Sequence, residues 1–164
     1  MKIIFRIGLL AIFVAAGVWL WTIFFPGPEK IIRHRLAEIA RLASFNPNEN
    51  PLAALGGAQK LAGLCNPNLQ VLLAAPINAQ HTFENREEIA QSDLAARSAF
   101  GGSLKVDFVD PIVTLAPDKQ SAVADLTARI QTSADLIVQE IKFTLQKVDG
   151  QWFVTRVETV RTFS

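Results

Sequence analysis

The chain has 164 residues, enough for one ordinary domain, and its formal net charge at pH 7 is +1. A charge this close to zero gives no strong attraction to nucleic acid, so we expect no nucleic-acid partner. Half of the residues are hydrophobic, and the single cysteine, Cys65, excludes both an intramolecular disulfide and a cysteine-rich zinc site.

The N-terminal part of the chain contains an apolar run, residues 7–25, without a charged side chain. As a helix this run would be about 28 Å long, close to the thickness of a hydrocarbon core. Aromatic residues gather at its far end, as at a membrane interface, and Pro26-Gly27-Pro28 would end the helix. We therefore expect a transmembrane anchor over residues 1–28 and a folded domain over residues 29–164.

Cleavage and orientation of this segment have alternatives. Lys2 and Arg6 would also suit a cleaved signal peptide, but the lack of an A-x-A site before the break favours an uncleaved anchor. A basic tail before an apolar run is typical of a signal anchor that exports the domain, whereas the basic residues after the run count against export. We expect a single-pass membrane protein with an extracytoplasmic domain, whose partner is a membrane protein or a second copy of the chain.

Two helices are predicted directly after this segment. Residues 29–45 place apolar side chains on one face at helical spacing, among them Ile32, Leu36 and Ile39. Asn50-Pro51 is typical of a helix start, and this second helix would continue through about Leu64. Gly56-Gly57 weakens that prediction and would allow another element to approach closely.

A third helix and then a series of strands follow. Asn85 and Glu88 resemble a capping box, which predicts a helix over residues 86–100, and Gly101-Gly102 would end it. Residues 68–75 could form a short strand. After residue 102 the hydrophobic period changes to 2, and Pro111 indicates a bulge or bend. Four long strands are expected, over residues 103–116, 121–131, 136–148 and 151–163.

Helices followed by consecutive strands indicate an α+β domain. Short turns between the four long strands predict an antiparallel sheet, and the three helices would cover its apolar face. We therefore expect about three helices packed on a four-stranded antiparallel sheet.

Two stretches of the sequence resemble the nuclear-transport-factor-like superfamily, which includes ketosteroid isomerase and scytalone dehydratase relatives. KVDGQWFVTRVE, residues 147–158, is similar to the closing hairpin of many members, and ENREEIAQ, residues 84–91, is similar to a helix start. The resemblance implies a cystatin-like cone, in which a curved sheet wraps the helices and often holds a ligand pocket. Members are enzymes, binding modules or assembly modules.

The closing hairpin supplies the candidate ligand-binding residues. If Asp149-Gly150 is a two-residue type I′ turn, Phe143 faces Arg156 and Ile141 faces Glu158. Arg156 and Glu158, with Gln139 nearby, would then lie on the apolar face, where unpaired charge is costly. Either they line the open end of the cone and orient a ligand, or they pair with each other or a helix residue at the sheet rim. A one-residue bulge would reverse the faces.

Evidence for an enzyme is weaker. His81 could serve as a general base or ligand contact, and Asp107 with Asp110 as an acid/base pair, although a loop histidine and a charged strand edge are the simpler interpretations. The isomerase-like and dehydratase-like relatives typically use a tyrosine, and this chain has none. We expect no catalytic residue, cofactor or metal, and a membrane-anchored scaffold or domain that binds a small apolar ligand. The alternative is an isomerase or hydro-lyase with a histidine or aspartate base.

Overall fold

The computed structural model describes residues 14, 17, 27–74 and 79–160. The chain divides into two compact units, Met1–Ile31 and Ile32–Ser164, and the second unit contains the whole sheet. The fold and the candidate site described below belong to this second unit.

The three predicted helices are confirmed as α2 (Pro28–Ala43), α3 (Pro51–Gly63) and α4 (Arg86–Phe100). The Asn50 side chain accepts a hydrogen bond from the backbone N–H of Leu52, and Asn85 accepts one from Glu88, each at 2.9 Å. These contacts satisfy backbone donors that a helix start leaves free. Gly101 ends α4 in a left-handed conformation with φ of 58°, which glycine adopts without a steric penalty.

The sheet has six strands, in the order β2-β1-β6-β5-β4-β3. Strand β1 runs parallel to β6, and the other neighbouring pairs are antiparallel. The strands are β1 (Cys65–Leu73), β2 (Ala79–Thr82), β3 (Leu104–Leu115), β4 (Ser121–Thr132), β5 (Leu136–Val148) and β6 (Gln151–Thr159).

The prediction of a four-stranded antiparallel sheet is therefore wrong. The four long strands exist, but β1 and β2 extend the sheet beyond β6 and make it mixed. β1 begins at Cys65 and continues directly through Asn66-Pro67-Asn68, a stretch more typical of a turn than of a strand. Its parallel pairing joins Cys65 to Val154, and such a distant contact leaves no local pattern in the sequence.

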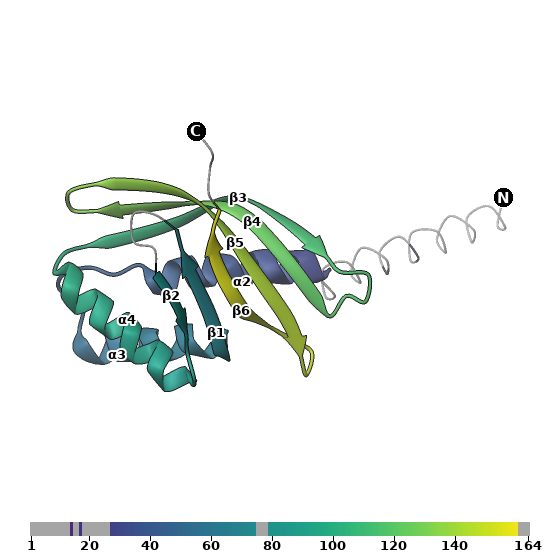
Figure 1. Cartoon of the computed structure of the whole chain (residues 1–164), viewed down its shortest axis with the longest axis horizontal. Helices are drawn as coiled ribbons and strands as arrows, with labels where there is room; N and C mark the ends of the chain where they lie inside the picture. The colour runs from purple at the N-terminus through teal and green to yellow at the C-terminus, as the bar shows by residue number, and fades with distance from the viewer. Residues whose placement is uncertain (1–13, 15–16, 18–26, 75–78, 161–164) are drawn as a thin grey trace, which may run out of the picture. The chain divides into compact units, whose positions relative to one another are not determined.

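The core lies between the helices and one face of the strongly twisted sheet, which α2 crosses (Figure 1). α2 contributes Ile32, Leu36 and Ile39, its predicted apolar face. No polar or charged side chain is buried among the residues with described side chains. The largest fully buried side chains are Trp152, Ile32, Leu36, Leu145 and Val154. Apolar side chains thus fill the centre of the cone.

The prediction of a transmembrane helix is corrected by the structure. Among the described residues, no helix is both long enough and apolar enough to cross a bilayer. Helix α2 has 16 residues and is amphipathic, so its apolar face packs in the domain core. The expected span, residues 7–25, lies outside the described residues except for Val14 and Gly17. The expected localisation as a single-pass membrane protein is corrected with it.

Candidate functional site

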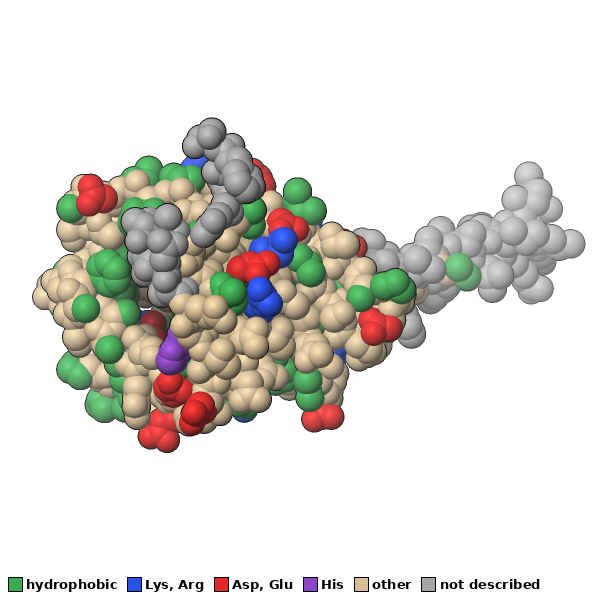
Figure 2. Space-filling model, in the orientation of Figure 1, with side chains coloured by type: hydrophobic (Ala, Val, Ile, Leu, Met, Phe, Trp, Pro, Cys, Tyr) green, Lys and Arg blue, Asp and Glu red, His purple; other side chains and the backbone are tan. Residues whose placement is uncertain are grey.

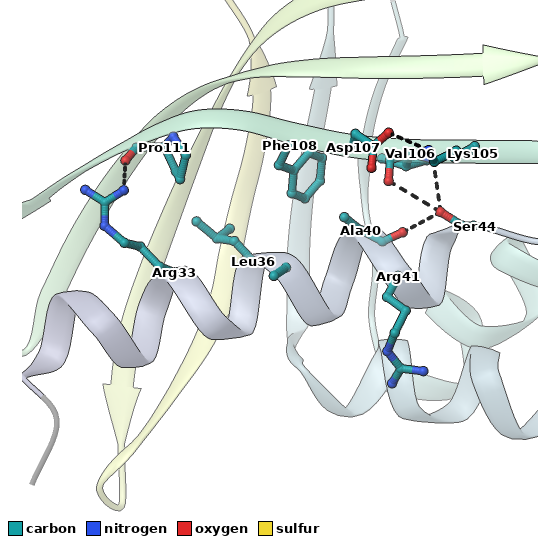
Figure 3. Close-up of a pocket in the computed structure, with 11 residues that line it drawn as sticks. Arg33, Leu36, Ala40, Arg41, Ser44, Lys105, Val106, Asp107, Phe108 and Pro111 are labelled. Carbon is teal, nitrogen blue, oxygen red and sulfur yellow. Dashed lines mark hydrogen bonds and ion pairs between the residues drawn. The ribbon is translucent and has the colours of Figure 1, made fainter. Parts of the chain in front are cut away.

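A cleft of about 410 Å³ lies between α2 and β3. Side chains at helical spacing along α2 form one wall of the cleft, and β3 forms the opposite wall (Figure 3). The lining residues are Arg33, Leu36, Ala37, Ala40 and Arg41 of α2, Ser44 directly after α2, and Lys105, Val106, Asp107, Phe108 and Pro111 of β3.

Ser44 holds the C-terminal end of α2 against β3. Its hydroxyl donates to the carbonyl of Ala40 at 2.7 Å and accepts from the N–H of Val106 at 2.9 Å. Beside it, Phe45 and Leu104 exchange two backbone hydrogen bonds of 2.8 and 2.9 Å. These hydrogen bonds therefore fix the position of the backbone at this end of the cleft (Figure 3).

At the other end of the cleft, Arg33 reaches from α2 to β3, and its guanidinium donates to the carbonyl of Pro111 (Figure 3). The register of β3 shifts between Val109 and Ile112, which confirms the bulge predicted at Pro111. Asp110 has a φ of 49° there, a left-handed conformation that Asp tolerates better than most residues. The bulge turns the Pro111 carbonyl away from the ladder with β4, where Arg33 meets it.

The charge around the cleft is mainly positive. Lys105 forms an ion pair of 3.3 Å with Asp107, but both side chains are more than half exposed. Arg41 points away from β3 (Figure 3). Arg33 makes no ion pair with any residue that the structure describes. The cleft therefore combines an apolar interior with one uncompensated cation at the Arg33 end.

Two further clefts lie outside this one. A wider one of about 810 Å³ continues from Arg41 and Ser44 around the loop that follows α2. A groove of about 420 Å³ separates α3 from α4 and is lined by Leu55, Ala90 and Leu94, among others. The cleft between α2 and β3, whose walls include Leu36 and Phe108, has the most apolar lining of the three.

Arg156 and Glu158 do not lie on the apolar face, and this part of the prediction is wrong. The Asp149-Gly150 turn forms as expected, with φ of 50° and 81°. However, Leu145 pairs with Val154 and Thr144 with Arg156, so Thr155 is an extra residue in β6. This bulge moves both charges to the outer face.

On the outer face Arg156 and Glu158 pair with each other. The Arg156 Nε donates to Glu158 at 2.9 Å, and Lys142 lies 3.8 Å from the same carboxylate. Figure 2 shows acidic and basic side chains alternating across this face of the sheet. The simpler of the two interpretations, an ion pair, is thus the one the structure shows.

Gln139 and His81 are not brought together with Arg156. Gln139 pairs with the buried Ala128, so it lies on the core face, where its amide donates to the carbonyl of Val160 at 3.4 Å. His81 pairs with Val71, which packs against the core, and therefore lies on the face opposite Arg156. Its ring is 2.9 Å from Glu88 and stacks edge-on against Phe83. The four candidate ligand contacts remain a prediction, without a shared cavity.

Three titratable groups with shifted pKa values lie outside the cleft. Burial raises the pKa of the Cys65 thiol to about 11, although Arg86 and Arg35 act to lower it. Hydrogen bonds from the Glu84 N–H and from His81 lower the pKa of Glu88. Burial raises the pKa of Asp93 even though it pairs with Arg97. Among the described residues no three His, Cys, Asp or Glu side chains are grouped as metal ligands would be.

The sequence did not identify the cleft, because its two walls are about 70 residues apart in the chain. One signal was present. Arg33 begins a series of polar or small side chains along α2, which leaves one flank of the helix without large apolar residues. A flank of this kind packs incompletely against a neighbouring strand.

Comparisons with known proteins identify the fold. No family model and no curated protein matches the chain. An NTF2-like protein with a cystatin-like fold from Novosphingobium aromaticivorans has a TM-score of 0.62 and 18% identity, over 89% of this chain and 86% of its own. A protein of the same organism, named provisionally as a scytalone dehydratase, has a TM-score of 0.59 and 16% identity, over 82% and 84%.

A third structure, a protein of unknown function with a cystatin-like fold from Nostoc punctiforme, has a TM-score of 0.58 and 12% identity, over 82% of this chain and 92% of its own. Identities this low show the fold and not the activity. The chain has the NTF2-like, cystatin-like fold, as its resemblance to the nuclear-transport-factor-like superfamily implied.

Proposed function

We propose that the protein is a non-enzymatic binding domain, which holds a small, largely apolar ligand in the cleft between α2 and β3. The observation that carries this proposal is the cleft itself. Its volume of about 410 Å³ falls within the range of small-molecule sites, and Leu36, Ala40 and Phe108 give it an apolar interior (Figure 3).

Two observations favour binding over catalysis. A general base needs a position inside a pocket and an environment that tunes its pKa. Asp107 is the one carboxylate that lines the cleft among the described residues, and its side chain is 55% exposed and paired with Lys105. Cys65, Glu88 and Asp93, whose pKa values are shifted, each lie elsewhere. The predicted partners, a membrane protein or a second copy of the chain, stay predictions.

The test uses the full chain and the uncharged fluorescent probe N-phenyl-1-naphthylamine. We expect saturable binding of one probe per chain. The variant Ala37→Phe should weaken probe binding at least about tenfold. The new ring occupies the cleft, so the probe loses burial equivalent to about two methylene groups or more. Ala37 is exposed, so the larger side chain has room outside the core.

The matched control is Ala53→Phe, which adds the same ring to an exposed position of α3 that lines none of the three clefts. It should bind the probe as the unmodified chain does. Equal binding by Ala37→Phe and the unmodified chain would show that the probe binds elsewhere and would overturn the proposal.

A further inference from the structure

The charge and length of the cleft between α2 and β3 define a class of ligand. Resting on the proposed function above, we propose that the ligand is an amphipathic monocarboxylate. Its carboxylate binds the guanidinium of Arg33, and its acyl chain extends along α2 towards Ser44.

Arg33 provides the charge for this assignment. Its guanidinium donates to the Pro111 carbonyl, a neutral acceptor, and it makes no ion pair with a described residue. Every Asp and Glu of the chain falls within the described ranges. The charge of Arg33 is therefore not compensated by an acidic side chain. A carboxylate accepts two parallel hydrogen bonds from a guanidinium, which a single carbonyl oxygen does not.

The other two cations of the cleft are less suited to this role. Lys105 already pairs with Asp107, and Arg41 points away from β3 (Figure 3). Arg33 is thus the cation of the cleft lining that lacks an ion pair with a described residue and also reaches toward β3. This distribution favours a ligand with one anionic group over a dicarboxylate.

The apolar part of the cleft sets the length of the ligand. Arg33 and Ser44 are eleven positions apart on α2, which corresponds to about 16 Å and to an extended chain of about twelve carbons. Between them the cleft is lined by Leu36, Ala37, Ala40, Val106 and Phe108. The two alanines leave the space that the chain would occupy.

At the Ser44 end of the cleft the polar side chains of β3 already have partners, since Lys105 and Asp107 pair with each other. The Ser44 hydroxyl already donates to the Ala40 carbonyl and accepts from the Val106 N–H. The O–H of Ser44 therefore already donates one hydrogen bond, and its oxygen already accepts one, so the hydroxyl has no free donor for a ligand. A methyl terminus needs no partner there.

The experiment compares two ligands of equal length, dodecanoate and dodecanol, at submicellar concentrations. Each displaces N-phenyl-1-naphthylamine from the full chain near neutral pH. We expect dodecanoate to bind about fivefold more tightly than dodecanol, since Arg33 is exposed and an exposed ion pair contributes modestly. Added salt should reduce this preference.

The variant Arg33→Gln should still bind the uncharged probe and should bind dodecanoate and dodecanol equally. The matched control, Arg41→Gln, removes the same charge from the same helix and should keep the preference. Retained probe binding also shows that each variant is folded and that its cleft is intact.

The outcomes separate this inference from the proposed function. Probe binding at the cleft with equal affinity for the acid and the alcohol overturns the carboxylate assignment alone. A preference that survives in Arg33→Gln, or that is lost equally in Arg41→Gln, also overturns it. Absence of probe binding at the cleft overturns the proposed function, and the carboxylate assignment with it.

Discussion

At the scale of single residues, Arg97 makes the largest number of different contacts described here. Its side chain is 8% exposed and donates to Asp93 at 2.7 Å, to Glu49 at 2.8 Å and to the carbonyl of Leu42 at 2.6 Å. The guanidinium also lies 5.2 Å from the ring centre of Phe45. Arg97 therefore connects the end of α2, the following loop and α4 through one cation.

Replacing Arg97 by methionine should lower the free energy of unfolding by about 3 kcal/mol. The substitution leaves Asp93, with a side chain 14% exposed, without its partner, and an unpaired buried charge costs about that much. The measurement is denaturant unfolding followed by circular dichroism. Arg129→Met, at an exposed position of β4, should change stability by less than about 0.5 kcal/mol.

The same variant gives a pH dependence with a defined sign. Burial raises the pKa of Asp93, so the folded state favours its protonated form and its contribution to stability falls as pH rises through that pKa. Without Arg97 this effect should be larger. The stability deficit of Arg97→Met should therefore shrink as pH falls below the pKa of Asp93, and a deficit that grows at low pH would contradict this account.

At the scale of elements, two glycines should respond in opposite directions to alanine. Gly56 lies inside α3, and a Cβ added there would meet no atom within 4 Å. Gly56→Ala should stabilise the protein by about 0.5–1 kcal/mol, because alanine loses less backbone entropy in a helix. The idea that Gly56 allows a close approach of another element is thereby corrected.

Gly150 occupies the second position of the β5–β6 turn with φ of 81°. A Cβ there is not blocked by a neighbour, but the left-handed conformation itself costs an L-residue about 1–2 kcal/mol. Gly150→Ala should therefore destabilise the protein by about that amount. Thermal unfolding of both variants against the unmodified chain tests the pair, and a shift of the same sign in both would refute the conformational argument.

The same hairpin shows what local sequence can predict. Asp149-Gly150 determines its own turn, because only a few residue types accept positive φ at both positions. The bulge at Thr155 has no such signal. β6 lies between antiparallel β5 and parallel β1, and its pairing with β1 also shifts register, between Cys65 and Gln70. The bulge thus depends on two neighbours at once, and the faces of Arg156 and Glu158 follow from it.

At the scale of the whole molecule, the hydrophobic periodicity of the sequence predicts that helices precede four long strands. It does not predict the number of strands in the sheet or the parallel pair. The helical spacing of α2 and α4 and the alternation in β4 are local patterns, and each element formed where its pattern predicted. The β1–β6 pairing and the cleft both join segments distant in the chain. Three of the four candidate ligand contacts, Gln139, Arg156 and Glu158, lie on one hairpin, whereas the cleft joins α2 to β3.

The centre of the domain is lined by buried apolar side chains. β4 presents small residues to the core, and Ala122, Ala124 and Ala128 are 2%, 0% and 0% exposed. Larger side chains from other elements occupy the volume above them, including Phe143, which pairs with Ala124. The cleft chosen for the proposed ligand lies at the flank of α2, beside this core.

This view of the core gives a direct test. Ala124 is 0% exposed, and a leucine there should overpack the core at a cost of about 1–3 kcal/mol. Val123→Leu, on the outer face and half-buried, adds one methylene without entering the core and should have little effect. Denaturant unfolding of both variants measures the difference. A neutral or stabilising Ala124→Leu would mean that the core contains an empty volume beside Phe143, and an interior pocket would then compete with the cleft as the ligand site.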